Sequence, residues 1–315
     1  MQLSKIPNRD VTKKTLTSKI LPKLQWNKLG WDCPSESNLQ KAHPMPAIRQ
    51  PTLFLSHGGG PWPWLMEEMP FHEQLNGFLK ALPSQLAETP RALLVISGHW
   101  EEAETAIMSG AHPPMIYDYG GFPEHTYHIQ YPAPGDPTFA LRVQGLLSGG
   151  GIPAHLDPNR GFDHGAFTIA YPMYPHANIP MVQLSLKSGY DPEFHLRLGN
   201  ALAPLRDEGI LIIGSGLSYH NMRGFQINDR GSNPATEQSR RFDDWLTESL
   251  VNSSSDERRQ RLLHWERAPE ARAVHPQEDH LIPLMVAAGA AENDKATRIY
   301  NELFRGVMCS SFRFG

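Results

Sequence analysis

Three histidines of this chain follow runs of apolar residues. His57 and His99 come two and three residues after the ends of such runs, and His220 follows a third run several residues later. The neutral imidazole is the commonest metal-binding side chain near neutral pH. A buried strand followed by a turn would explain any one of these histidines alone. Because the pattern occurs three times, we interpret it as a metal site.

The apolar runs 53–55, 92–96 and 210–213 show no polar alternation, and Gly or Ser residues bound them. Such runs are typical of parallel strands that are buried on both faces. In open α/β sheets, ligands bind outside the carboxyl ends of the strands. The sequence therefore predicts an α/β fold with a mostly parallel central sheet, flanked by helices, and a metal site at the carboxyl ends of the strands.

Two further histidines lie beside acidic residues. His164 follows Asp163 and precedes a glycine, and it would serve equally as a turn residue or helix cap. His280 ends a stretch, 275–280, that holds two histidines and two carboxylates and that would also suit a helix cap. Histidines with nearby acids and no cysteine ligand suit Fe(II) or Zn(II) better than Ca or Mg, which prefer oxygen ligands.

The segment 111–135 is rich in Tyr, His and Pro. A long irregular loop inside a compact domain is usually functional or disordered, and this aromatic content argues against disorder. We expect the loop to form a wall or lid over the crevice, where aromatic rings stack on a flat substrate. Within it, His125 and Tyr127 are the candidate substrate-binding residues.

Apolar spacing and capping residues predict the other elements. Asp191 is expected to cap a helix that has proline at its first position. The segment 252–258 is interpreted as a solvated connection. The predicted helices are 65–82, 137–147, 192–205, 235–251 and 285–291, and the further predicted strands are 105–108 and 181–186.

Composition limits the classes of function. With 315 residues, 40% of them hydrophobic, the chain could form one large α/β domain or two smaller ones. Residues 1–48 are expected to be an N-terminal extension before a domain at 49–315. The first 50 residues carry a net charge of +6 and the rest −10, which argues against nucleic acid as a partner.

The two cysteines, Cys33 and Cys309, form no CxxC pair and indicate a reducing compartment. No apolar stretch approaches the ~20 residues that cross a bilayer, and we find no signal peptide. We therefore expect a cytoplasmic protein that does not bind membranes.

Six motifs stand in order along the chain. They are Ser56-His57-Gly58, Ser97-Gly98-His99-Trp100, Tyr131-Pro132-Ala133-Pro134-Gly135, Gly161-Phe162-Asp163-His164-Gly165, His220-Asn221-Met222-Arg223 and Glu278-Asp279-His280. In these motifs and their order the chain resembles the class III extradiol ring-cleaving dioxygenases, and most closely their 4,5-DOPA extradiol dioxygenase branch. The resemblance runs from about residue 51 to 291.

The resemblance implies a single α/β domain, one divalent metal ion, and the opening of a catechol by O2 to a muconic semialdehyde. By motif, His57, His99 and His280 are the expected metal ligands. His220 is either a fourth ligand or the acid/base for the catechol proton, and His164 lies near the substrate or O2. The better-known enzymes of the class use two histidines and a glutamate, whereas His280 holds the third position here.

Two other functions stay open from the sequence. Three-histidine zinc sites also support hydrolysis by bound hydroxide, so a zinc hydrolase is the main alternative. A protein that binds metal without turnover is the other. The presence of both His164 and His220 beyond the three expected ligands favours the oxygenase. The expected ion is Fe(II) for activity or Zn(II) as bound, and the expected substrates are a catechol and O2. The chain could also assemble as a homo-oligomer.

Overall fold

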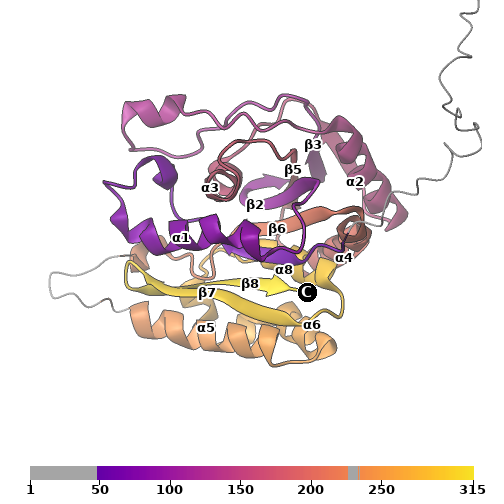
Figure 1. The fold of residues 1–315 in the computed structure, drawn as a ribbon. Coiled ribbons are helices and arrows are strands. Elements are labelled where there is room, and N and C mark those ends of the chain that lie inside the picture. The colour runs from indigo at the N-terminus through magenta and orange to yellow at the C-terminus, as the bar shows by residue number, and fades with distance from the viewer. Residues whose placement is uncertain (1–47, 226–232, 234) are drawn as a thin grey trace, which may run out of the picture. The chain divides into compact units, whose positions relative to one another are not determined.

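The computed structural model describes residues 48–225, 233 and 235–315 of the chain. Its strands are β1 (Thr52–Ser56), β2 (Ala92–Glu102), β3 (Thr105–Met108), β4 (Ala154–Asp157), β5 (Met181–Lys187), β6 (Ile210–Gly216), β7 (Ala296–Phe304) and β8 (Val307–Phe314). They form one sheet in the order β4-β3-β5-β2-β6-β1-β8-β7 (Figure 1). The central strands β5, β2, β6 and β1 are parallel, which confirms the predicted α/β fold with a mostly parallel sheet.

Both faces of the central strands are buried. Leu53 and Val95 pack on one face, whereas Phe54 and Leu94 pack on the other. This double burial is the physical reason for apolar runs without polar alternation. The helices are α1 (Glu73–Ala81), α2 (Pro137–Gly149), α3 (His164–Met173), α4 (Pro192–Leu202), α5 (Ala235–Val251), α6 (Ser255–Leu263), α7 (Ala271–Val274) and α8 (Ile282–Ala291).

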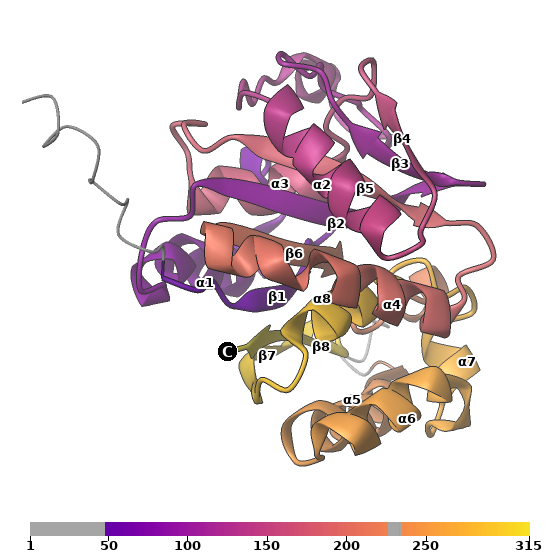
Figure 2. The same ribbon diagram turned by 90° about the vertical axis from the view of Figure 1, so that its right-hand side faces the viewer.

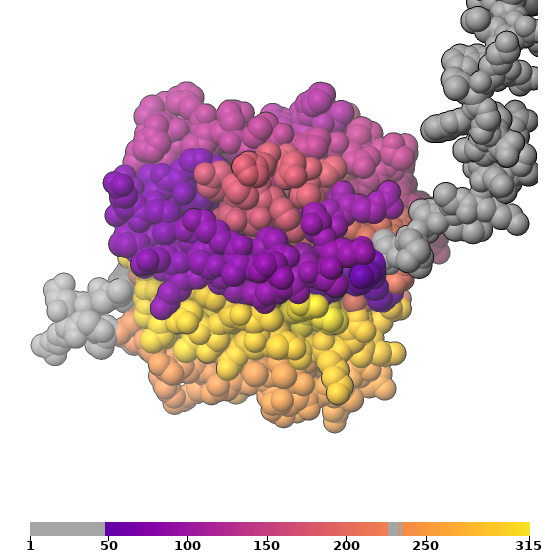
Figure 3. All heavy atoms as spheres, in the orientation of Figure 1, coloured from indigo at the N-terminus to yellow at the C-terminus, as the bar shows by residue number. Residues whose placement is uncertain are grey.

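The helices form two layers around the sheet. The first face is covered by α1 and α3, and the second by α2, α4 and α8 (Figure 2). Helix α5 packs on the hairpin of β7 and β8. On the face shown in Figure 3, the segment that carries α1 runs along this C-terminal hairpin, where the rings of Phe78 and Tyr300 lie 5.0 Å apart.

Several elements differ from the sequence prediction. Helix α6 begins at Ser255, inside the segment predicted to be a connection, because Ser254 and Glu257 form a capping box. Only 73–81 of the predicted helix 65–82 is α-helical, since Pro70 begins a separate 3-10 turn. The strands β4, β7 and β8 were not predicted at all.

Other predictions are confirmed. The helix predicted at 235–251 is α5. Asp191 caps α4 and accepts a hydrogen bond from the N–H of Glu193 at 3.1 Å. Among the helices that the structure describes, none is long and apolar enough to cross a membrane.

The predicted extension, residues 1–48, lies outside the described residues except for Ile48, as does Cys33. From residue 49 the chain is attached to the domain. Arg49 forms ion pairs with Asp207 at 2.6 Å and Glu292 at 2.7 Å, and Cys309 is buried as a free thiol. The division at 48/49 stays a prediction.

Candidate metal centre

The turn after β1 fixes His57. The carbonyl oxygen of His57 accepts hydrogen bonds from Nε1 of Trp62 at 2.6 Å and from Oγ1 of Thr168 at 3.2 Å. The next residue, Gly58, has a φ of 75°, and a Cβ there would lie 2.6 Å from Nε1 of Trp62. Only glycine suits this turn. The buried imidazole of His57 is thereby held at the carboxyl end of β1.

Two other elements bring His99 and His280 to the same place. His99 lies in β2 where the pairing with β5 shifts register between Ile96 and Glu101, and such irregularities re-aim side chains. His280 precedes α8, and its carbonyl oxygen accepts a hydrogen bond from the N–H of Leu217 at 3.1 Å, just beyond β6. The loop before α8 is thus attached to the carboxyl end of a central strand.

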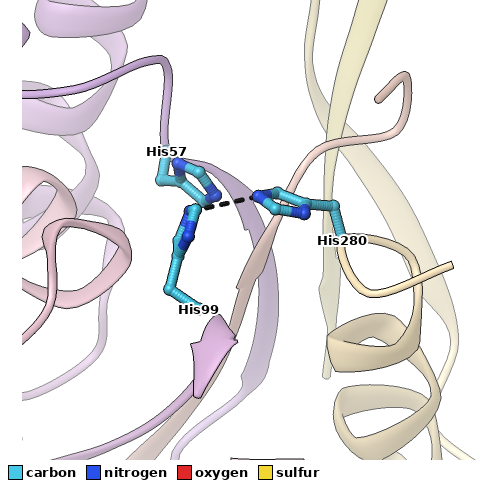
Figure 4. A group of neighbouring side chains, drawn as sticks. All are labelled: His57, His99 and His280. Carbon is cyan, nitrogen blue, oxygen red and sulfur yellow. Dashed lines mark hydrogen bonds between the residues drawn. The ribbon is translucent and has the colours of Figure 1, made fainter. Parts of the chain in front are cut away.

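The three imidazoles converge, as Figure 4 shows. One ring nitrogen of each lies within 4.8 Å of the others. Nε2 of His99 and Nε2 of His280 lie 3.1 Å apart. The ring centre of His57 is 5.0 Å from that of His99 and 5.1 Å from that of His280. The three side chains that the sequence predicted as ligands come from distant motifs but lie together in the folded chain.

Two carboxylates lie near the Nδ1 atoms of two of these imidazoles and of two further ones. Oδ2 of Asp279 lies 2.8 Å from Nδ1 of His280, and its Oδ1 lies 3.4 Å from Nδ1 of His220. Asp118 is placed in the same way, with its Oδ1 2.9 Å from Nδ1 of His164 and its Oδ2 3.5 Å from Nδ1 of His99. Each carboxylate thus lies beside one expected ligand and one further histidine.

This arrangement fits a divalent metal ion. A carboxylate at Nδ1 places the proton there and leaves the lone pair on Nε2. In His99 and His280 the lone pairs would then face each other at 3.1 Å, which a cation between them would stabilise. Both nitrogens of the buried His57 have no hydrogen-bond partner among the described residues. Buried polar atoms normally have a partner, which a bound ion would supply here.

The electrostatics keep the imidazoles neutral and the carboxylates charged. Burial and the neighbouring histidines lower the pKa of His57 well below its usual value and that of His99 to about 4. Burial also lowers the pKa of His280. Burial alone would raise the pKa of Asp118, but His164 and His99 outweigh it and lower that pKa to about 2. Metal-binding histidines need this neutral form.

The five histidines open into a cavity of about 310 Å³. Apart from the histidines its wall is largely aromatic, with Tyr119 and Phe122 from the loop 111–135. That loop therefore forms part of the wall, as predicted. His72 also lines the cavity and stacks on Trp62 with ring centres 4.9 Å apart, and burial lowers the pKa of His72 to about 3.

Comparison with known proteins identifies the family. Residues 51–312 match the model of the catalytic LigB subunit of aromatic ring-opening dioxygenase. The chain belongs to this family.

Relatives of this ring-opening dioxygenase agree with that result. The 4,5-DOPA dioxygenase extradiol of Beta vulgaris is 40% identical over 84% of this chain and 96% of its own length, and that of Escherichia coli K12 is 34% identical over 81% and 90%. The dioxygenase tasH of Hapsidospora irregularis is 36% identical over 84% and 85%. A crystal structure of an uncharacterized E. coli K12 protein superposes with a TM-score of 0.67 at 29% identity, covering 85% of this chain and all of that one.

Two histidines lie beside the three converging rings of the dioxygenase. The ring of His220 stacks on that of His280, with centres 3.4 Å apart. The ring of His164 lies 3.9 Å from that of His99 and 5.3 Å from that of His57. Both line the cavity. A ring nitrogen of His220 lies within 4.8 Å of ligand atoms of Asp279 and His280, but His220 does not belong to the corresponding cluster of His57, His99 and His280.

Other residues that the sequence singled out lie elsewhere. His125 is exposed in the 3-10 helix Glu124–His128 and does not line the cavity. Tyr127 also lies outside the cavity wall and contacts the ring of Tyr119, with centres 5.4 Å apart. Their role as substrate contacts stays a prediction. His275, of the stretch rich in ligand types, is buried and contacts the carbonyl oxygen of Ser218 at 3.1 Å instead.

Sequence reasoning missed the role of Asp118. Asp163, the acidic neighbour of His164, caps α3 and accepts a hydrogen bond from Oγ of Ser97 at 2.8 Å, while Asp118 lies beside the imidazole of His164. Adjacent residues on a helix start point apart, which is why Asp163 does not reach that imidazole. The sequence feature that could have indicated a role for Asp118 is its place between two tyrosines in the aromatic loop.

Proposed function

We propose that this dioxygenase holds one divalent metal ion between His57, His99 and His280, and that it cleaves a DOPA-type catechol next to its hydroxyl pair. The observation that carries the proposal is the 3.1 Å approach of Nε2 of His99 to Nε2 of His280, beside the unpartnered imidazole of His57. Both atoms of O2 enter the product, a muconic semialdehyde, so the reaction needs no other oxidant.

The bound metal would lower the pKa of the catechol hydroxyls and hold catechol and O2 side by side. Fe(II) is the proposed active ion because the reaction transfers electrons to O2, which redox-inert Zn(II) does not support. The all-histidine set also suits Zn(II), so purified protein is expected to hold zinc in an inactive form. A zinc hydrolase would use that same form.

His220 is proposed as the acid/base that takes a catechol proton and returns it. Its Nδ1 faces Asp279, so Nε2 on the other side of the ring is the atom that exchanges the proton. Asp279 orients the ring and stabilises its charged form. His164, whose Nδ1 faces Asp118, is proposed to stand beside the substrate or O2. Histidine is the side chain that most often transfers protons in enzymes.

The test is reconstitution without oxygen. Metal-free protein is loaded with Fe(II) or with Zn(II), and then supplied with L-DOPA or catechol and O2. We expect oxygen uptake and a yellow semialdehyde with Fe(II) only. Metal-loaded protein that opens no member of a catechol panel would refute the proposal, and ester hydrolysis by the zinc form would favour the alternative. The 49–315 catalytic domain, the cytoplasmic location and the homo-oligomer also stay proposals.

A further inference from the structure

One arginine lines the cavity that the histidines open into. Arg305 lies at the turn between β7 and β8, and the centre of its guanidinium is 5.2 Å from the ring centre of Phe71. The surrounding wall is apolar, formed by Phe71, Met222, Phe225 and Phe304. A cation stacked on an aromatic ring keeps its planar group in a defined orientation. The cavity thus offers an oriented, solvent-exposed guanidinium beside an apolar wall.

No acidic residue of the cavity wall forms an ion pair with Arg305 among the described residues. Asp118 is the other charged residue of the wall besides the histidines, and it lies beside His164 and His99. In the part of the chain that the structure describes, no carboxylate pairs with Arg305. By contrast, Arg298 of the same hairpin is bonded to Asp243 at 3.0 Å. A ligand is therefore the natural counter-charge for Arg305.

The backbone conformation at Arg305 also indicates a functional role for this residue. The turn is Arg305-Gly306, since Phe304 pairs with Val307, and both turn residues have positive φ, 47° and 85°. Asn or Gly suit the first position of such a turn, whereas arginine is strained there. Nδ2 of Asn233 donates to the carbonyl oxygen of Arg305 at 3.1 Å and holds the turn in place. Residues with a strained backbone of this kind cluster at active and ligand-binding sites.

We propose that Arg305 binds the carboxylate of the substrate and so selects catechols whose side chain ends in a carboxylate. The inference rests on the proposed function: the catechol oxygens would lie at the histidines and the carboxylate at the hairpin turn. The planar fork of arginine matches a carboxylate with two parallel hydrogen bonds. Arg305 is thus a specificity-determining residue of the same cavity, and neutral or cationic catechols are the weaker substrates.

The first experiment compares two substrates on the Fe(II)-loaded protein. We expect Arg305→Gln to lower kcat/KM for 3,4-dihydroxyphenylpropionate by roughly tenfold or more, mainly through KM, because hydrogen bonds to charged groups are strong. For 4-methylcatechol the change should stay within about twofold. Arg223→Gln is the matched control: it removes an equal charge at an exposed position, and Arg223 does not line the cavity.

Equal losses for both substrates, or an equal effect of Arg223→Gln and Arg305→Gln, would overturn the proposal. Arg305→Asn serves as the folding control. Asparagine suits the turn, so this variant should melt no lower than the parent protein and still lose the preference for the carboxylate.

A binding measurement separates this inference from the proposed function. Titration calorimetry compares 3-(4-hydroxyphenyl)propionate with 4-ethylphenol, which both lack the hydroxyl pair that ring cleavage requires. If the parent protein prefers the propionate and Arg305→Gln does not, the inference holds even when no catechol is opened. If catechols are opened but both ligands bind the two proteins alike, only the inference fails.

Discussion

Nε2 of His99 and Nε2 of His280 lie 3.1 Å apart, although 181 residues separate them along the chain. No contact between neutral imidazoles would hold two lone pairs at this distance without a shared proton or cation. The proposed metal ion would therefore join the loop before α8 to the central sheet.

Removal of either ring should abolish tight metal binding. We expect His99→Ala and His280→Ala to lower the affinity for Fe(II) or Zn(II) by far more than 10–100-fold. A loss of 10–100-fold is typical when a residue that only hydrogen-bonds to a ligand is replaced. Titration calorimetry and elemental analysis measure the loss. His128→Ala is the control, since the His128 side chain is 72% exposed. Full metal occupancy in either test variant would show that the ion lies elsewhere.

The sequence predicted the convergence of these histidines better than it predicted their surroundings. The apolar runs before His57 and His99 predicted parallel strands, and parallel strands place their carboxyl ends together. Asp118 escaped prediction because its partner, His164, is 46 residues away and only the folded loop brings them together. The hairpin turn at Arg305 was missed because the strand before it is polar and half-exposed, without a clear apolar pattern.

Asp279 should support metal binding without touching the ion. Its carboxylate holds Nδ1 of His280 at 2.8 Å, so Asp279→Asn should weaken metal affinity roughly 10–100-fold. Glu278→Gln is the neighbouring control, because Glu278 pairs with Arg272 at 2.6 Å instead. Metal competition with a chromogenic chelator gives both affinities. Equal affinities for the two variants would contradict the role given to Asp279.

His220 and His164 should affect turnover more than metal binding. We expect His220→Gln to keep the metal and to lower kcat roughly 10²–10⁴-fold, the usual contribution of a general acid/base. The pH profile of kcat should lose one limb. Rapid kinetics and metal content are measured on the same samples. Loss of the metal would instead make His220 a fourth ligand.

A glycine next to the centre offers a test that leaves every ligand in place. A Cβ on Gly216 would lie 2.1 Å from the carbonyl oxygen of His280, so Gly216→Ala must displace the loop that carries His280. We expect weaker metal binding and a lower melting temperature. Gly77→Ala in α1 is the control: its Cβ meets nothing within 4 Å, and it should stabilise the helix by about 0.5–1 kcal/mol. Unchanged metal affinity in Gly216→Ala would argue against this coupling.

Buried histidines outside the centre predict loss of stability in acid. Burial lowers the pKa of His195 to about 4, from about 6.5 in the unfolded chain. Between these values the unfolded chain binds the extra proton, so stability is complete above pH ~6.5 and falls as the pH drops toward 4, by up to ~1.4 kcal/mol per pH unit for this group.

His195→Gln should flatten this part of the curve, measured by urea unfolding of metal-free protein from pH 7 to pH 4. The exposed His128→Gln serves as the comparison. An unchanged slope in His195→Gln would show that His195 takes no part in the acid response.

The position of β1 governs how the chain assembles. β1 precedes the other strands of the sheet in the chain, yet both of its neighbours, β6 and β8, lie far downstream. During synthesis the segment with His57 therefore keeps unpaired edges until β6 and β8 have also left the ribosome. Such distant pairing makes folding slow. Loss of β8 alone would leave one edge of β1 unpaired, so its removal should be far more damaging than the length of β8 suggests.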